Sequence, residues 1–277
     1  MAEFSGHLSL LAAVREPGGR TVLAGKSFRA PFHISKPYWD ADAGTLLVQV
    51  VNPTAGILAG DRLVSEISVQ AGASLLVTTP SASRVFQMRD GVAECRQQFA
   101  VAAGAWLEVM PEPLVPHRGS SYRQVTTVDV EPGGSLFFVE PLLPGRIGHG
   151  ESWVWERLRL ELTVRLGGEL IARERFDQSG LALRELAELS GSGASACFAN
   201  AILIAPAYDP ATVPAWRSDL NALHRDGLWL GVSALRRGGW SLKLIATGSV
   251  QLRQALRDVR VILARYFPKL TCDPRKL

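Results

Sequence analysis

Apolar and polar residues alternate with a period of two through most of the chain before residue 177. Such alternation is typical of β-strands that bury one face. Four segments extend the pattern, because in each an alternating stretch runs into a glycine, a small residue, any residue and then leucine. These segments are Ile67–Leu75, Phe99–Leu107, Val128–Leu136 and Leu162–Leu170. The pattern predicts that residues 20–176 are almost entirely β-structure.

The four segments form an internal repeat, which recurs roughly every 30 residues. A glycine followed by a small residue supplies the positive φ that a tight hairpin requires, and the leucine restarts the buried face. A fixed period favours stacked β-hairpin layers that share one core, in a β-helix-like or sandwich-like arrangement. Four ordinary hairpins of a sandwich, without stacking, remain the alternative.

The pattern changes after Gly180, which divides the chain into a stacked β body, residues 1–180, and a C-terminal α+β portion, residues 181–277, packed on it. Leu181–Leu189 is compatible with a short helix, and Leu228–Ala234 with Trp240–Ala246 indicates a hairpin. About two helices are expected in this portion, over Pro210–His224 and Val250–Phe267. One apolar stripe follows the last helix. It consists of Leu252, Leu256, Val259, Leu263 and Phe267.

Composition narrows the class of protein. The 277 residues carry a formal net charge of +4 that is scattered along the chain, so nucleic-acid binding is not expected. No apolar run approaches the roughly 20 residues that a membrane-spanning helix needs. Glu3 stands where a signal peptide would be basic, and the three cysteines form no paired motif. These features predict a cytoplasmic protein that does not enter a membrane.

Local motifs of catalysis and metal binding are missing. The sequence has no nucleophile elbow, Walker loop, dinucleotide fingerprint or zinc-protease helix. Gly56–Asp61 is rich in glycine, but a strand pattern follows it, whereas a phosphate site needs a helix. The five histidines are too dispersed in sequence to predict a metal site. They are His7, His33, His117, His149 and His224.

Several oxygen-bearing side chains stand beside turns in different repeat units, where stacking can align them. The carboxylates are Asp61, Glu112, Glu140 and Glu151, and a hydroxyl-rich patch is formed by Thr78, Thr79, Ser81 and Ser83. Such residues commonly cap turns, and two carboxylates can form a glycosidase pair. Oxygen-rich, weakly coordinating groups also suit the transit of a hydrated cation. All three interpretations stay open at this point.

The same places carry a family resemblance. Three segments are similar to motifs of the urease accessory proteins of the D type, also called H, and this similarity covers residues 6–180 well and the remainder in outline. The segments are Asn52–Ala82, Met110–Pro116 and Pro144–Glu151. The family usually has glycine at the positions of Ala55 and Ala59, whereas Asp61 and Thr78-Thr79-Pro80 follow its pattern.

The resemblance implies a scaffold or chaperone that is not an enzyme. It would bind apo-urease together with an F-type accessory protein and a G-type accessory GTPase, and nickel would pass through it without being tightly bound as a cofactor. Candidates to line the nickel passage are Asp61, Thr79, Ser81, Ser83, Glu112, Glu140 and Glu151. Candidates to dock the F-type protein are Leu252, Leu256, Val259, Leu263 and Phe267.

Two other functions compete with this one. A carbohydrate-binding or other ligand-binding β module would need an exposed aromatic groove. The aromatic candidates are Trp39, Trp106, Phe137, Phe138, Trp153 and Trp155. A β-helix hydrolase would instead use two of the carboxylates as acid and base or nucleophile.

Overall fold

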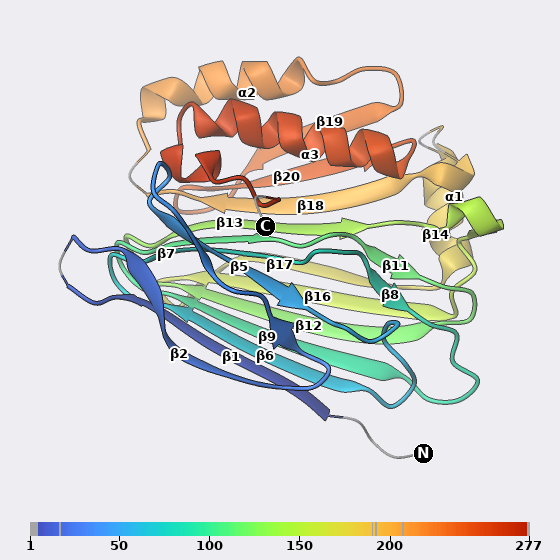
Figure 1. Ribbon diagram of the computed structural model, residues 1–277. Helices are drawn as coiled ribbons and strands as arrows, with labels where there is room; N and C mark the ends of the chain where they lie inside the picture. Colours follow the sequence, from blue (N-terminus) through green and yellow to red (C-terminus); the bar gives the residue numbers. More distant parts are fainter. Residues whose placement is uncertain (1–4, 17, 190, 192, 207, 276–277) are drawn as a thin grey trace.

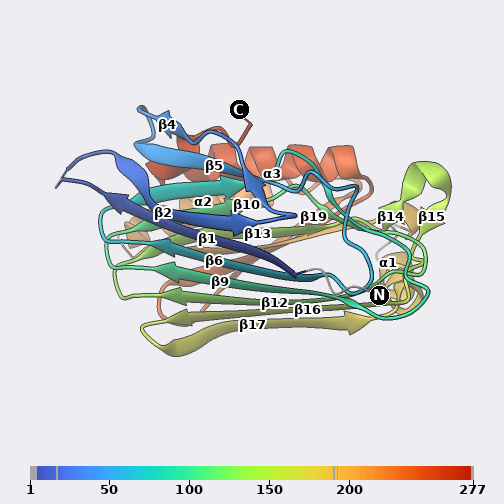
Figure 2. The ribbon, with the colours of Figure 1, turned by 60° about the horizontal axis from the view of Figure 1, so that its bottom comes forward.

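The computed structural model describes residues 5–16, 18–189, 191, 193–206 and 208–275. Within these residues the chain forms two large β-sheets that face each other, with two helices on the outer side of the second sheet (Figure 1). The turns between the sheets gather at one end of the molecule and longer loops at the other (Figure 2). This layered arrangement confirms the prediction of a mainly β protein built from stacked layers.

The first sheet is built mostly from parallel strands, one from each repeat unit. Its order is β17 (Glu169–Gln178), β16 (Arg157–Leu166), β12 (Ser121–Val130), β9 (Ala93–Val101), β6 (Arg62–Val69), β1 (Ser5–Val14) and β2 (Thr21–Arg29). The β6, β9, β12 and β16 strands pair in parallel and in register, so equivalent positions of successive units form rows across the sheet. Only the edge strands β2 and β17 pair antiparallel.

The second sheet continues from the repeat units into the C-terminal portion. Its order is β19 (Leu228–Ala234), β20 (Gly239–Ala246), β18 (Cys197–Ile204), β13 (Ser135–Leu142), β10 (Trp106–Met110), β7 (Ser74–Thr78), β5 (Thr45–Val51) and β3 (His33–Ile34). Short strands β4 (Tyr38–Asp40), β8 (Ser83–Val85) and β11 (Leu114–Pro116) join its side, and β14 (Gly145–Arg146) pairs with β15 (Glu151–Ser152). Because β18 pairs with β13, residues 197–246 extend the sheet of the β body.

The repeat units differ in one respect from the expected hairpins. In the first three units the strands before and after the glycine turn do not pair with each other but enter opposite sheets, as β6 and β7 do. The turns therefore form arches, and Gly72, Gly104 and Gly133 adopt φ values of 75°, 70° and 89° there. In-register stacking gives each strand its hydrogen-bonding partner in the next unit. Only the fourth unit, β16 with β17, is a true hairpin.

The C-terminal portion has three α-helices in its described residues rather than about two. They are α1 (Gly180–Leu189), α2 (Val213–Asn221) and α3 (Ser249–Ala264), with short 3₁₀ turns at Gly193–Ser195, Pro210–Thr212 and Pro268–Thr271. Another 3₁₀ turn, Ile147–His149, lies in the β body. The α3 helix ends before Phe267, and Pro268 begins the 3₁₀ turn η4 that follows. Helices α2 and α3 cover the outer face of the second sheet (Figure 1).

Three large hydrophobic clusters hold these layers together, and a small fourth cluster includes Cys272. The first fills the space between the sheets near the glycine turns, with Ile67, Phe99 and Leu136 among its members. A second joins the outer face of the second sheet to α2 and α3. The third lies between the sheets at the loop end, around Trp153 and Trp155. Between the first and third clusters the inward side chains become polar, and the candidate site lies there.

Candidate functional site

A cavity of about 550 Å³ lies between the two sheets. Its wall takes side chains from β6, β9, β12 and β16 of the first sheet and from β7, β10, β13 and β18 of the second. The volume falls in the range of small-molecule sites and far exceeds the roughly 30 Å³ that one water occupies in the liquid. The cavity therefore has room for a metal ion that keeps a shell of water.

One wall of the cavity owes its polarity to the register of the parallel strands. Ser65 on β6 is opposite Gln97 on β9, and Gln97 is opposite Thr126 on β12. These positions face inward, in phase with apolar neighbours such as Ile67 and Phe99. Sequence reasoning missed this row, although polar residues at the apolar phase of three strands were a readable signal.

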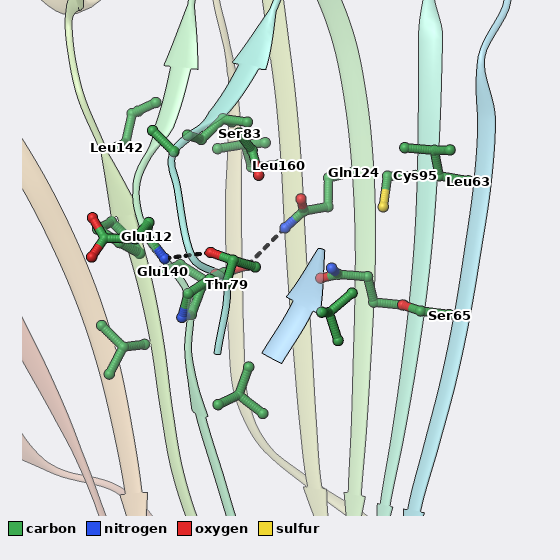
Figure 3. A pocket seen from close by; sticks show the side chains of 18 of the residues that line it. Leu63, Ser65, Thr79, Ser83, Cys95, Glu112, Gln124, Glu140, Leu142 and Leu160 are labelled. Atoms are coloured by element: carbon green, nitrogen blue, oxygen red, sulfur yellow. Dashed lines mark hydrogen bonds between the residues drawn. The ribbon is translucent and has the colours of Figure 1, made fainter. Parts of the chain in front are cut away.

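Gln124 links the two sheets inside the cavity (Figure 3). Its side-chain nitrogen Nε2 donates to Glu140 Oε1 at 3.0 Å and to Thr126 Oγ1 at 3.3 Å. Its oxygen Oε1 accepts from the Tyr122 hydroxyl at 3.1 Å, and Thr126 Oγ1 donates to Gln97 Oε1 at 3.0 Å. A continuous hydrogen-bonded network thus runs from the first sheet to the carboxyl group of Glu140.

Glu140 is the carboxyl group of this network. Its pKa is raised to about 7, mainly because burial disfavours the charged form. The hydrogen bond from Gln124 opposes this increase, the charge of Glu174 adds to it, and the charge of Lys243 opposes it. Near neutral pH the side chain is therefore divided between its neutral and charged forms. It can accept or release a proton at little cost when a cation approaches.

Cys95 also faces the cavity, beside Tyr122. Burial raises the pKa of its thiol to about 11, although its hydrogen bond with Tyr122 lowers it. Because the thiolate is the form that binds metals, a thiol held protonated in this way captures a passing cation poorly.

The cavity reaches the surface beside the hydroxyl-rich patch found in the sequence. We call Thr79, Ser81, Ser83 and Glu112 the Glu112 rim, since all four line the cavity and are partly or fully exposed. Thr79 Oγ1 accepts a hydrogen bond of 2.8 Å from the Glu112 backbone nitrogen (Figure 3). Together with Glu140, the rim comprises five of the seven residues expected to line a passage.

A second part of the wall brings together residues that sequence reasoning missed. We call Glu174, Asn200 and Lys243 the Lys243 rim, because all three line the cavity. Glu140, Asn200 and Lys243 share one row across β13, β18 and β20. Lys243 Nζ lies 2.7 Å from Glu174 Oε2 and donates to Asn200 Oδ1 at 3.3 Å. This ion pair links the edge strand of the first sheet to the second sheet.

The other two candidates for the passage, Asp61 and Glu151, do not lie on the cavity wall. Asp61 Oδ2 accepts a 2.8 Å hydrogen bond from the backbone nitrogen of Leu58, so it closes its own turn. Glu151 forms a bidentate pair with Arg146, at 2.7 and 2.9 Å, which holds the pKa of this carboxyl below its usual value. Asp61 thus caps its own turn, and Glu151 links β15 to β14 through Arg146.

The turn before Asp61 shows which of its residues need to be glycine. Gly56 and Gly60 have φ values of 157° and 84°, whereas Ala55 and Ala59 have no positive φ. A β-carbon at Gly56 would lie 2.5 Å from Phe86 Cε2. The two alanines therefore occupy positions whose backbone conformation does not require glycine.

The five side chains expected to dock a partner face the protein interior. Leu252, Leu256, Val259, Leu263 and Phe267 are each at most 7% exposed and belong to the cluster between α3 and the second sheet. Their apolar stripe therefore binds the sheet, because the outer faces of β18 and β20 are themselves apolar. A docking surface on α3 would have to use its outward residues instead, such as Val250, Arg257 and Val261.

The aromatic side chains considered for a ligand groove are in the core. Trp106, Phe137, Phe138, Trp153 and Trp155 are buried, and the remaining one, Trp39, packs partly buried against the first cluster. The described residues include no group of three or more His, Cys, Asp or Glu placed to hold a metal ion. Likewise, no helix in the described part of the chain is long and apolar enough to cross a membrane.

Comparison with known proteins places this geometry in a family. A family model described as UreD urease accessory protein matches residues 5–276. A urease accessory protein UreD of Opitutus terrae is 63% identical over 275 residues, which cover 99% of this chain and 100% of that protein. Proteins of the same name are 37% identical in an Arthrobacter species (58% of this chain, 54% of that protein) and 34% identical in Yersinia pseudotuberculosis (73% and 64%). The chain therefore belongs to the UreD urease accessory protein family.

Proposed function

We propose that this protein is a non-catalytic scaffold for urease maturation, which binds apo-urease in the cytoplasm and lets nickel pass to its active site. An F-type accessory protein and a G-type accessory GTPase are the proposed further partners. Family membership supports the link to urease. The observation that carries the nickel path is the polar cavity between the sheets, with Glu140 at its centre.

The chemistry of the cavity wall favours transit over storage. A tight nickel site would gather several imidazoles or thiolates around the ion. The polar groups here are mainly hydroxyl, amide and carboxyl groups, which bind a hydrated cation weakly through oxygen. Cys95 is held as a thiol, and Glu140 can become an anion when a cation arrives. The wall can therefore attract a divalent ion and still release it.

Co-expression with the urease structural and accessory proteins tests this function. We expect urease made without this chain to contain little nickel and to be nearly inactive, and the full chain to restore both. Glu140→Ala should still co-purify with urease but restore less nickel. Full nickel loading in the absence of this chain, or failure of the chain to co-purify with urease and the accessory proteins, would contradict the proposal.

A further inference from the structure

The carboxylate at the Glu112 rim is already paired with cations of the same chain. Glu112 Oε1 lies 2.6 Å from Arg275 Nη2, and Glu112 Oε2 lies 3.5 Å from Arg253 Nη2. Arg253 belongs to α3, and Arg275 to the segment that follows η4. Two guanidinium groups from the C-terminal portion thus neutralise the carboxylate at this opening of the cavity.

The residues that precede the segment with Arg275 are held firmly against the second sheet, and we call their contacts the anchor. Arg260 on α3 forms a bidentate ion pair with Glu108 on β10, at 2.8 and 3.1 Å, and its Nη2 donates to the Cys272 carbonyl oxygen at 2.7 Å. Cys272 is buried against the second sheet. Lys269 Nζ donates to two more carbonyl oxygens, those of Ala43 and Gly44. The chain is therefore fixed up to Cys272, and only a short arm reaches Glu112.

The contact between the arm and Glu112 is itself exposed. The side chains of Arg253 and Arg275 are 46% and 47% exposed, and that of Glu112 is 19% exposed. Ion pairs whose side chains are this exposed to solvent contribute little to stability and are screened by salt. The anchor thus keeps the arm close to the rim, while the pair itself can break at small cost.

We propose that Arg253 and Arg275 act as a latch, which keeps metal ions from the Glu112 rim until the arm carries Arg275 away and the Arg253 side chain turns from Glu112. The inference rests on the proposed function, because it describes how the opening of the proposed nickel path is controlled. A divalent cation and a guanidinium group compete for the same carboxylate oxygens, so the rim binds the ion more tightly once the arginines leave. The C-terminal portion thereby controls access to the cavity.

The Lys243 rim repeats the arrangement on a different strand. There Lys243 of β20 pairs with Glu174 at 2.7 Å, and both residues line the cavity. At both rims the carboxylate belongs to residues 1–180 and the paired cation to residues 181–277. This second pair shows that the arginines at Glu112 follow a common pattern in which the C-terminal portion neutralises the acidic rims.

Titration of the purified full chain with Ni²⁺ tests the latch. Arg253→Gln/Arg275→Gln removes both cations, and we expect it to tighten Ni²⁺ binding roughly three- to tenfold over the unaltered chain. Adding Glu112→Gln to the double variant should abolish the gain. Arg123→Gln is the matched control, because Arg123 is 46% exposed and pairs with Glu94 on the first sheet, away from the cavity wall. It should leave Ni²⁺ binding unchanged.

The results separate the latch from the proposed function. Unchanged Ni²⁺ binding in Arg253→Gln/Arg275→Gln, or a gain that survives Glu112→Gln, overturns the latch even if the chain activates urease. A gain that depends on Glu112 supports the latch even if the chain fails to co-purify with urease. Thermal unfolding of each variant should match the unaltered chain, since every substituted side chain except Glu112 is about half exposed.

Discussion

Glu140 Oε1 and Gln124 Nε2 are joined by a 3.0 Å hydrogen bond that crosses the cavity from the second sheet to the first. The two residues lie on β13 and β12, the two strands of one repeat unit. The glycine arch between these strands sends them into opposite sheets, so their side chains meet face to face. The repeat therefore builds both the fold and the polar centre of the cavity.

This relationship predicts a pH dependence of stability. The pKa of Glu140, about 7, exceeds its ordinary value of 4.5, so the folded chain holds the proton more tightly than the unfolded chain. The stabilising effect is complete below the ordinary pKa and is lost as the pH rises through about 7. From about pH 5 to about pH 8 the free energy of unfolding should therefore fall by about 2–3 kcal/mol more in the unaltered chain than in Glu140→Gln. Urea unfolding of both proteins at both pH values measures this difference. Equal changes in the free energy of unfolding with pH would show that the pKa of Glu140 is not raised.

The ion pair between Glu108 and Arg260 predicts a large loss of stability when one partner is removed. Glu108 is fully buried, and Arg260 is 8% exposed. Glu108→Gln or Arg260→Met leaves an uncompensated buried charge and should lower the free energy of unfolding by about 3–5 kcal/mol. Arg123→Gln, which breaks an exposed pair, should cost less than about 1 kcal/mol. Chemical unfolding measures the loss of free energy of unfolding in each variant. Equal losses from the buried and the exposed pair would contradict the anchor described for the C-terminal arm.

The two glycines before Asp61 should respond differently to alanine. A β-carbon at Gly56 meets Phe86 at 2.5 Å and the Arg84 carbonyl oxygen at 2.6 Å, whereas one at Gly60 meets nothing within 4 Å. Gly60→Ala should cost only the strain of its positive φ, about 1 kcal/mol, and Gly56→Ala at least about 2 kcal/mol. Thermal unfolding ranks the two variants. A Gly60→Ala variant less stable than Gly56→Ala would show that the close approach of Phe86 to Gly56 does not limit this turn.

Substitutions of Asp61 separate the effect of its charge from the effect of its hydrogen bond in the turn. Its carboxylate accepts the Leu58 backbone hydrogen bond, and Asn at this position keeps an acceptor oxygen, whereas Ala does not. We expect Asp61→Ala to lose about 1 kcal/mol of stability and some urease activation in cells, and Asp61→Asn to retain most of both. Unfolding and activation are measured on the same variants. If Asp61→Asn were stable yet inactive, the charge of Asp61 would be needed for nickel delivery.

The sequence predicted the layered β fold because its repeat is both periodic and local. The glycine turns and the alternating strands each report on neighbouring residues, so stacking followed from them. Whether two consecutive strands pair with each other or enter opposite sheets depends on contacts between units, and the expected hairpins proved to be arches. For the same reason the apolar stripe on α3 does not reveal in the sequence whether a partner or the second sheet covers it, and the structure shows that the sheet does.

The candidate site was predicted in part. Thr79, Ser81, Ser83, Glu112 and Glu140 stand near turns, and the structure brings them to one cavity. Gln97, Gln124 and Lys243 lie inside regular strands, where only the phase of the alternation distinguishes inward from outward side chains. Asp61 and Glu151 also stand near turns, but each satisfies a local partner instead. Proximity to a turn alone did not separate these two roles.

Nickel loading of urease by a chain whose cavity is filled decides whether nickel passes between the two sheets. Ser65→Phe/Gln124→Phe places two rings inside the cavity, and Glu66→Phe/Arg123→Phe places them on the outer face of the same two strands. Nickel per urease active site is measured after co-expression, together with co-purification of the complex. We expect that both variants bind urease and that only the inner one lowers its nickel content several-fold. Full nickel loading by the inner variant would contradict a path through the cavity.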